Sequence, residues 1–177
     1  MKIDLIRHGE LVGEPTYCGI TNTKLSDHGW KQMDEACNKH QTWDVIVSSP
    51  LIRCLAFAKK LSKDLSIPLN VNPQWQEMNF GKWDGLTVKE IMAFNEKELG
   101  RFWKDPLRNP PPDGESLSDM KTRVLSAWRK IIDTKKDTLV ITHGGPLRII
   151  NCHLEGRPVE ALLEYDVPYA DRKTVLI

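Results

Sequence analysis

The chain has 177 residues, of which 40% are hydrophobic and 28% are charged, and its formal net charge is +1. These proportions are ordinary for a soluble globular protein, and the length suits a single domain over residues 1–177 with a sizeable core. The nearly balanced charge gives no overall electrostatic reason to expect nucleic acid or an acidic membrane as a partner. Any anion site must therefore come from a local cluster of basic residues.

No apolar run is long enough for a transmembrane helix, and the chain begins directly with a strand pattern rather than a signal peptide. The cysteines are widely scattered and form no CxxC pair of the kind that binds zinc or acts in redox chemistry. They are Cys18, Cys37, Cys54 and Cys152. We therefore expect reduced thiols and a cytoplasmic location, without contact with a membrane.

The first expected strand covers residues 2–7, and a second, DVIVS, covers 44–48. Both are short, apolar and rich in β-branched residues, which is typical of strands buried on both faces of a parallel sheet. Further strands are expected at 68–72, where the pattern is weaker, at 137–142, and at the end of the chain at 173–177.

Helical patterns lie between the strands, at 26–39, 50–65, 87–103 and 116–133, and a last helix with Pro146 in its first turn runs through about 154. Ser26 is a candidate N-cap for the first helix. Pro50 takes a natural first position in the second helix, and Pro146 suits the first turn of the last. A proline-rich loop at 105–115 is long enough to be a lid or substrate loop, or a plain connection.

Strands that alternate with helices predict an α/β domain with a largely parallel sheet. The sequence contains no internal repeat, low-complexity tract or domain linker. In open sheets of this class, ligands bind beyond the carboxyl ends of the strands. The residues that follow the strands are therefore the first candidates for a functional site.

Two of the expected strands are followed by the same dipeptide, His-Gly. The first strand ends in Arg7 and His8, and the strand 137–142 leads into His143 and Gly144. If these two strands are neighbours, both histidines meet at one place. Glycine allows a sharp turn and the close approach of a ligand, and the helix start after His143 offers backbone N–H groups to an anion.

Two more side chains suit phosphate chemistry beside such a pair. Arg53, in SSPLIRC, adds a second guanidinium to that of Arg7, and these forked donors match phosphate oxygens. Their positive charge opposes a metal cation, so we expect no metal, although two histidines alone would permit one. Glu77, beside a glycine- and aromatic-rich loop, is a carboxylic acid that can protonate a leaving oxygen.

Each of these residues alone has an ordinary structural interpretation, but the combination in this order is specific. At LIRHGE, SSPLIRCLAFA, EMNFGKWDG, PPDGES and VITHGG the sequence resembles the histidine phosphatase superfamily, and the resemblance spans nearly the whole chain. It implies the phosphoglycerate mutase-like fold, a three-layer α/β sandwich whose largely parallel central sheet is flanked by helices. It also implies an enzyme that acts on phosphomonoesters and needs no cofactor.

The resemblance implies roles for five residues. His8 is the nucleophile that forms a phosphohistidine, and Glu77 is the proton donor to the leaving alcohol. Arg7, Arg53 and His143 hold and neutralise the phosphoryl group. Water then hydrolyses the phosphohistidine, with Glu77 acting as base. A hydrogen bond from the second ring nitrogen of the nucleophile to a nearby carbonyl, such as that of the next residue, would fix the tautomer.

Other positions are candidate substrate contacts. Thr21 lies where related sequences place a polar contact residue, and an ordinary turn threonine is an equal alternative. Glu115 and Ser116 match a family loop near the active site, with helix N-capping as the alternative for Ser116. Many members carry an asparagine after RHGE, where this chain has Gly13 and Glu14. Part of the usual phosphate pocket is therefore missing or supplied elsewhere.

Within the superfamily, YCGITNTKLSDHG, SSPLIRC, QEMNFGKWDG and DGESLSDMKTRV are most similar to the alpha-ribazole phosphatases. That branch removes phosphate from alpha-ribazole 5'-phosphate during assembly of the cobalamin nucleotide loop. The aromatic base of such a substrate would stack on aromatic side chains, although large aromatics are usually core residues. The candidates are Phe80, Trp83, Phe102 and Trp103.

Other functions stay open. A broad-specificity phosphatase for sugar or nucleotide phosphates would share the same phosphate pocket. Phosphoglycerate mutases have inserted segments that shield the phosphohistidine from water, whereas this chain is short between Glu77 and His143. A silent binding module is disfavoured because the catalytic residues are all present. A metal-dependent hydrolase is disfavoured because the arginine charges oppose a metal cation. The expected partner is a small-molecule phosphomonoester, and a homodimer formed through a sheet edge is a further expectation.

Overall fold

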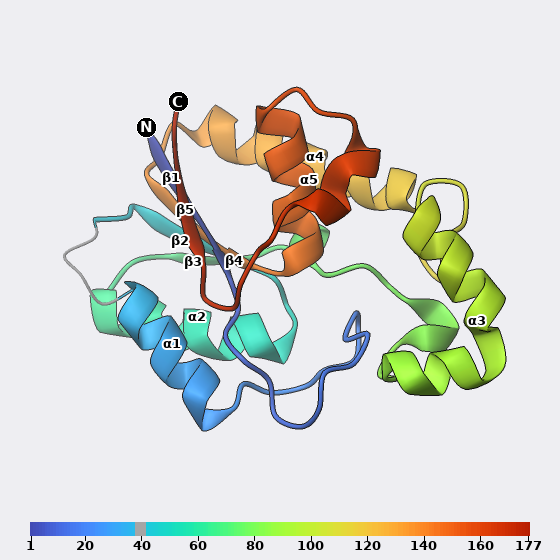
Figure 1. The fold of residues 1–177 in the computed structure, drawn as a ribbon. Helices are drawn as coiled ribbons and strands as arrows, with labels where there is room; N and C mark the ends of the chain where they lie inside the picture. Colours follow the sequence, from blue (N-terminus) through green and yellow to red (C-terminus); the bar gives the residue numbers. More distant parts are fainter. Residues whose placement is uncertain (38–41) are drawn as a thin grey trace.

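The computed structural model describes residues 1–37 and 42–177, and its centre is a five-stranded sheet in the order β3-β2-β4-β1-β5 (Figure 1). The strands are β1 (Lys2–Arg7), β2 (Val45–Ser48), β3 (Leu69–Val71), β4 (Thr138–Thr142) and β5 (Arg172–Leu176). Four of them are parallel, and β5 pairs with β1 in the antiparallel sense. The largely parallel sheet expected from the sequence is confirmed, with each strand within one residue of its expected bounds.

Helices cover both faces of the sheet. They are α1 (Asp27–Cys37), α2 (Ile52–Leu65), α3 (Val88–Lys104), α4 (Leu117–Thr134) and α5 (Gly144–Leu154). Alternate residues of the strands feed two cores: Leu5 and Val140 pack with α4 and α5, and Ile6 and Ile141 pack with α1 and α2. These are the three layers of the expected sandwich, and α3 lies to one side of the sheet (Figure 1).

Local signals explain most helix ends. The Ser26 hydroxyl accepts a hydrogen bond from the backbone of Gly29 at the start of α1, as expected of an N-cap. The last two positions of that expected helix, 38 and 39, lie outside the described residues. One expected start is wrong: Leu51 is extended, so α2 begins after Pro50. α5 begins at Gly144 with His143 at the N-cap position, which puts Pro146 in the first turn as expected.

The register between β1 and β4 sets the position of the candidate site. Arg7 pairs with Thr142, and the backbone N–H of His8 donates to the carbonyl of Thr142 over 2.9 Å. The expectation that these two strands are neighbours is therefore confirmed. Both histidines leave the sheet side by side, with their ring centroids 5.2 Å apart.

A buried carboxylate ties three segments of the sheet together. Asp4, in the middle of β1, is 0% exposed. It accepts a hydrogen bond from the indole N–H of Trp43 over 2.7 Å and another from the hydroxyl of Thr174 over 2.5 Å. The ammonium group of Lys2 lies 3.7 Å from it. This carboxylate therefore links the chain before β2 and the edge strand β5 to the centre of the sheet.

We predict that Asp4→Ala lowers the free energy of unfolding by about 3 kcal/mol, because it leaves the buried donors of Trp43 and Thr174 without an acceptor. Urea unfolding measures the loss. The control is Asp64→Ala, which removes an exposed partner of Lys60 and should change stability by less than about 1 kcal/mol. Equal effects of the two substitutions would contradict the role given to Asp4.

Candidate active site

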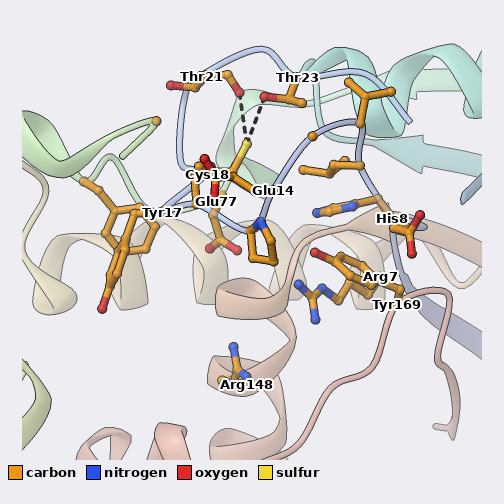
Figure 2. Close-up of a pocket in the computed structure, with 18 residues that line it drawn as sticks. Arg7, His8, Glu14, Tyr17, Cys18, Thr21, Thr23, Glu77, Arg148 and Tyr169 are labelled. Carbon is orange, nitrogen blue, oxygen red and sulfur yellow. Dashed lines mark hydrogen bonds between the residues drawn. The ribbon is translucent and has the colours of Figure 1, made fainter. Parts of the chain in front are cut away.

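His8 is the first residue after β1, is 4% exposed and borders a cavity of about 700 Å³ (Figure 2). Its Nδ1 lies 2.8 Å from the carbonyl oxygen of Gly9. A carbonyl can only accept, so Nδ1 carries the hydrogen and Nε2 keeps its lone pair. Position 9 must be glycine, because a Cβ there would lie 2.3 Å from the carbonyl oxygen of Gly29 in α1. The expected tautomer-fixing bond is thus present.

The surroundings of His8 keep its ring neutral. Burial lowers the pKa of His8 to about 3, and the positive charge of Arg53 acts in the same direction. The hydrogen bond to the Gly9 carbonyl raises this pKa, and the charge of Arg7 lowers it by a smaller amount. A neutral imidazole with a free Nε2 is a nucleophile or a proton acceptor. The ring therefore has the protonation state that attack on phosphorus requires.

Arg7 contributes a cation to the cavity wall. Its Nη1 donates to the carbonyl of Val167 over 2.6 Å, and its Cζ lies 4.1 Å from the ring centroid of Tyr169. Its Nε is buried and has no hydrogen-bond partner among the residues that the structure describes. Burial lowers the pKa of Arg7 from its usual value. The chain just before β5 thus orients this guanidinium, leaving one buried donor for a ligand.

Glu77 lies in the same cavity wall, in the segment that follows a short 3-10 helix at Pro73–Trp75. Its carboxylate accepts hydrogen bonds from the backbone N–H groups of Met78, over 3.0 Å, and of Gly145 in the first turn of α5, over 3.1 Å. These contacts hold the carboxylate beside the N-terminus of α5. Figure 2 shows Glu77 and His8 around one cavity, as the sequence predicts.

The segment that carries Glu77 is held by an arginine of α4. Arg123 donates to the backbone carbonyls of Gln74, Gln76 and Glu77, over 2.8 to 3.0 Å. It also forms a two-pronged ion pair with Glu115, at 2.6 and 2.7 Å. The carboxylate of Glu115 is thus engaged away from the cavity lining. Glu115 does not line the cavity and lies near the site through its contact with Arg123, so its contact with substrate stays a prediction.

Arg53 and His143 are brought next to His8 but do not line the cavity. Both are 0% exposed. Nδ1 of His143 accepts from Nε of Arg53 over 3.1 Å, so its Nε2–H donates to the Ser49 hydroxyl over 2.7 Å. Burial lowers the pKa of His143 well below its usual value. Their contact with a phosphoryl group stays a prediction.

The remaining donors of Arg53 hold the loop that faces His8. Its two terminal nitrogens donate to the carbonyls of Thr21, Cys18 and Gly19 over 2.5 to 3.0 Å. Asp84 fixes the same loop, because it accepts from the backbone N–H groups of Ile20 and Thr21 and from the Thr21 hydroxyl. Thr21 does line the cavity, as expected of a contact residue, but its hydroxyl is engaged with Asp84.

The other expected contacts are placed elsewhere. Ser116 caps α4 by accepting from the backbone of Asp119, so its capping alternative is confirmed. Gly144 does not line the cavity, but it is the first residue of α5 and lies next to the lining residues Arg7 and Arg148. Gly13 and Glu14 both line the cavity, in the stretch that lacks the usual asparagine.

Several residues of the cavity wall were not expected from the sequence, among them a cation and an aromatic residue. Arg148, in the second turn of α5, and Tyr169, before β5, point into the cavity in Figure 2. Arg148 lies four residues after Gly144 on a helix that was expected, so its helical spacing was an available signal. Tyr169 gave no signal, because only the long-range packing of the C-terminal segment brings it to His8.

A smaller apolar cleft of about 200 Å³ adjoins the main cavity. Tyr17, Glu77, Phe80 and Arg148 line both spaces. The cleft is otherwise lined mainly by apolar and aromatic residues, among them Met78, Phe102, Trp103, Leu117 and Leu163. Three of the four expected aromatics are therefore present, whereas Trp83 is wrong as a stacking residue because it is fully buried in the core.

Residues 1–37 and 42–177 contain neither a membrane-spanning helix nor a cluster of metal ligands. No helix there has the length and apolar character needed to cross a membrane. No three His, Cys, Asp or Glu side chains there converge as a metal site. All four cysteines are free thiols, as expected.

Comparison with known proteins identifies relatives over nearly the whole chain. The family model described as "Histidine phosphatase superfamily (branch 1)" matches residues 3–176. A bifunctional protein of Mycobacterium tuberculosis is 33% identical over 84% of this chain, which spans only 43% of that relative's length. An adenosylcobalamin/alpha-ribazole phosphatase of Escherichia coli K12 is 26% identical over 94% of this chain and 85% of its own.

A solved structure shows the same fold. The crystal structure of the alpha-ribazole phosphatase from Shigella flexneri superposes with a TM-score of 0.91 at 23% identity, over 100% of this chain and 91% of the other. The resemblance inferred from the motifs is thus confirmed, as is the phosphoglycerate mutase-like fold that it implied.

The lowered pKa of His8 predicts how stability depends on pH. His8 binds a proton below about pH 6.5 in the unfolded chain but only below about pH 3 in the native chain. Between these two pH values the unfolded state binds more protons, so the free energy of unfolding falls as the pH falls. Urea unfolding from pH 7 to pH 4 should show a shallower fall for His8→Asn than for wild type, by up to about 1.4 kcal/mol per pH unit. Parallel curves would contradict a neutral buried His8.

Proposed function

The chain belongs to the histidine phosphatase superfamily, branch 1; from this premise we propose that it is an enzyme that hydrolyses phosphomonoesters through a phosphohistidine on His8. One observation carries the proposal. The neutral ring of His8 has its Nδ1 hydrogen bonded to the Gly9 carbonyl, which leaves Nε2 as the only free nucleophilic atom of the ring beside the cavity.

In the first step, Nε2 of His8 forms a bond to phosphorus while the bond from phosphorus to the ester oxygen breaks. Glu77 gives that oxygen its proton, and the alcohol leaves. In the second step, water attacks the phosphohistidine, Glu77 takes the proton of the water, and the nitrogen–phosphorus bond breaks to release inorganic phosphate. In phosphoryl transfer the protein contributes mainly by positioning the reacting groups and by supplying positive charge that stabilises the transition state. Arg7 and the N-terminus of α5 supply charge at the cavity wall.

As substrate we propose alpha-ribazole 5'-phosphate, which would place the enzyme in cobalamin nucleotide-loop assembly in the cytoplasm. Two observations support this choice. Two similar proteins carry alpha-ribazole phosphatase in their names. The apolar cleft beside Glu77 offers Phe80, Phe102 and Trp103 to an aromatic base. A broad-specificity phosphatase is the alternative, because a shared phosphate pocket does not fix the leaving group.

The test is phosphate release from alpha-ribazole 5'-phosphate beside sugar phosphates, nucleotides and 3-phosphoglycerate, with a chelator present. We expect hydrolysis that the chelator does not affect and a kcat/KM highest for alpha-ribazole 5'-phosphate. Comparable values across the panel would contradict the specific substrate and support the broad-specificity alternative. No phosphate release from any ester would contradict the phosphatase itself.

We predict that Glu77→Gln slows hydrolysis most where the leaving group needs a proton. For alkyl phosphates kcat/KM should fall by about 100- to 1,000-fold, and for an activated aryl phosphate by less than about tenfold. Steady-state kinetics on the two ester classes measure the difference, with Glu35→Gln, an exposed change in α1, as the control. Equal losses on both classes would argue against Glu77 as the acid.

A further inference from the structure

Arg148 is a cation of the cavity wall to which no role has been given so far. It lies in the second turn of α5, and its Nε donates to the carbonyl of Tyr165 over 3.0 Å. Its terminal nitrogens have no hydrogen-bond or ion-pair partner within residues 1–37 and 42–177. The bond to Tyr165 therefore orients the guanidinium while its outer edge stays available to a ligand, and Figure 2 shows that edge pointing toward the cavity.

Arg148 and Arg7 converge on one point. A Cβ placed on Gly144 would lie 3.0 Å from Nη1 of Arg148 and 3.7 Å from Nε of Arg7. Two guanidinium groups thus meet over the first residue of α5, where the helix dipole is also positive. The charge of Arg148 helps to lower the pKa of Arg7, as expected of neighbouring like charges. A dianionic group between them would relieve this repulsion.

Within residues 1–37 and 42–177, no acidic residue of the cavity lining forms an ion pair with Arg7 or Arg148. Glu77 lies beside the same first turn of α5, and its charge raises the pKa of Arg7. Its oxygens accept from backbone N–H groups and form no ion pair with either arginine. Glu10, also in the lining, accepts from the Ser26 hydroxyl, and Glu14 is exposed. Arg53, the second arginine expected at the phosphate, is engaged with loop carbonyls instead. Arg7 and Arg148 are therefore the guanidinium groups that the described cavity wall presents.

From this geometry we propose that Arg148 binds the phosphoryl group of the substrate together with Arg7. The proposal rests on the proposed function and adds a second phosphoryl-binding arginine to it. Arg148 also lines the apolar cleft, so it lies at the boundary where the ester oxygen joins the phosphoryl group to the rest of the substrate. It contacts the transferred group rather than the leaving group. Its contribution is accordingly the same for every phosphomonoester.

The test uses Arg148→Gln and Arg148→Lys in the full chain, with Arg129→Gln, an exposed change in α4, as the control. Calorimetry measures the binding of inorganic phosphate, which requires no turnover. We expect Arg148→Gln to weaken phosphate binding by about 10- to 100-fold, as loss of a hydrogen bond to a charged group does. The lysine variant should recover part of the affinity, and the control should match wild type.

Kinetics then separate the phosphoryl group from the leaving group. Arg148→Gln should lower kcat/KM by the same factor for alkyl and aryl phosphates. Losses that depend on the leaving group, or phosphate affinity within twofold of wild type in both Arg148 variants, would overturn the proposal while leaving the phosphatase intact. A wild-type protein that binds no phosphate and hydrolyses no ester would overturn the proposed function as well.

Discussion

The parallel pairing of β1 with β4 is the constraint on which the site depends. The register sets Arg7 opposite Thr142, so each histidine leaves the sheet one residue later at the same edge. The N–H of His8 continues the ladder by donating to Thr142. A slip of one residue would turn alternate side chains to the other face of the sheet and separate the two rings. Backbone hydrogen bonds of the sheet therefore fix the relative position of the two histidines.

Two arginines link the sheet and helices to the loops that form the cavity wall. Arg53 joins His143 to the loop at 18–21, and Arg123 joins α4 to the segment that carries Glu77. Each forms several charge-assisted hydrogen bonds to backbone carbonyls, which are stronger than bonds between neutral groups. The walls of the cavity are thus cross-linked through cations that do not themselves line it. Arg7 and Arg148 are the arginines that line the cavity itself.

The sequence predicted the sheet because its strands are short, apolar and separated by amphipathic helices. It predicted His8 and His143 because strand ends of a parallel sheet meet at one edge. It could not show that the guanidinium of Arg53 turns toward carbonyls about thirty residues earlier, because that direction depends on the path of a loop without a periodic pattern. The same limit applies to Tyr169, which reaches His8 only through the packing of the C-terminal segment.

The comparison of Glu115 with Ser116 shows a related limit. Both follow a proline-rich stretch and match a motif near the active site, yet one pairs with Arg123 and the other caps α4. The motif correctly predicted that both residues lie near the site. Only the contacts show that they hold α4 and Arg123 in place without lining the cavity.

The most direct test of the account is to trap the intermediate. Excess enzyme is mixed with an aryl phosphate, denatured in alkali within the first turnover, and mapped by peptide mass spectrometry. The account predicts one phosphoryl group, on the peptide that contains His8, and its loss on brief treatment with acid. Release of phosphate at the wild-type rate without phosphorylation of His8, or with the phosphoryl group on another side chain, would contradict it.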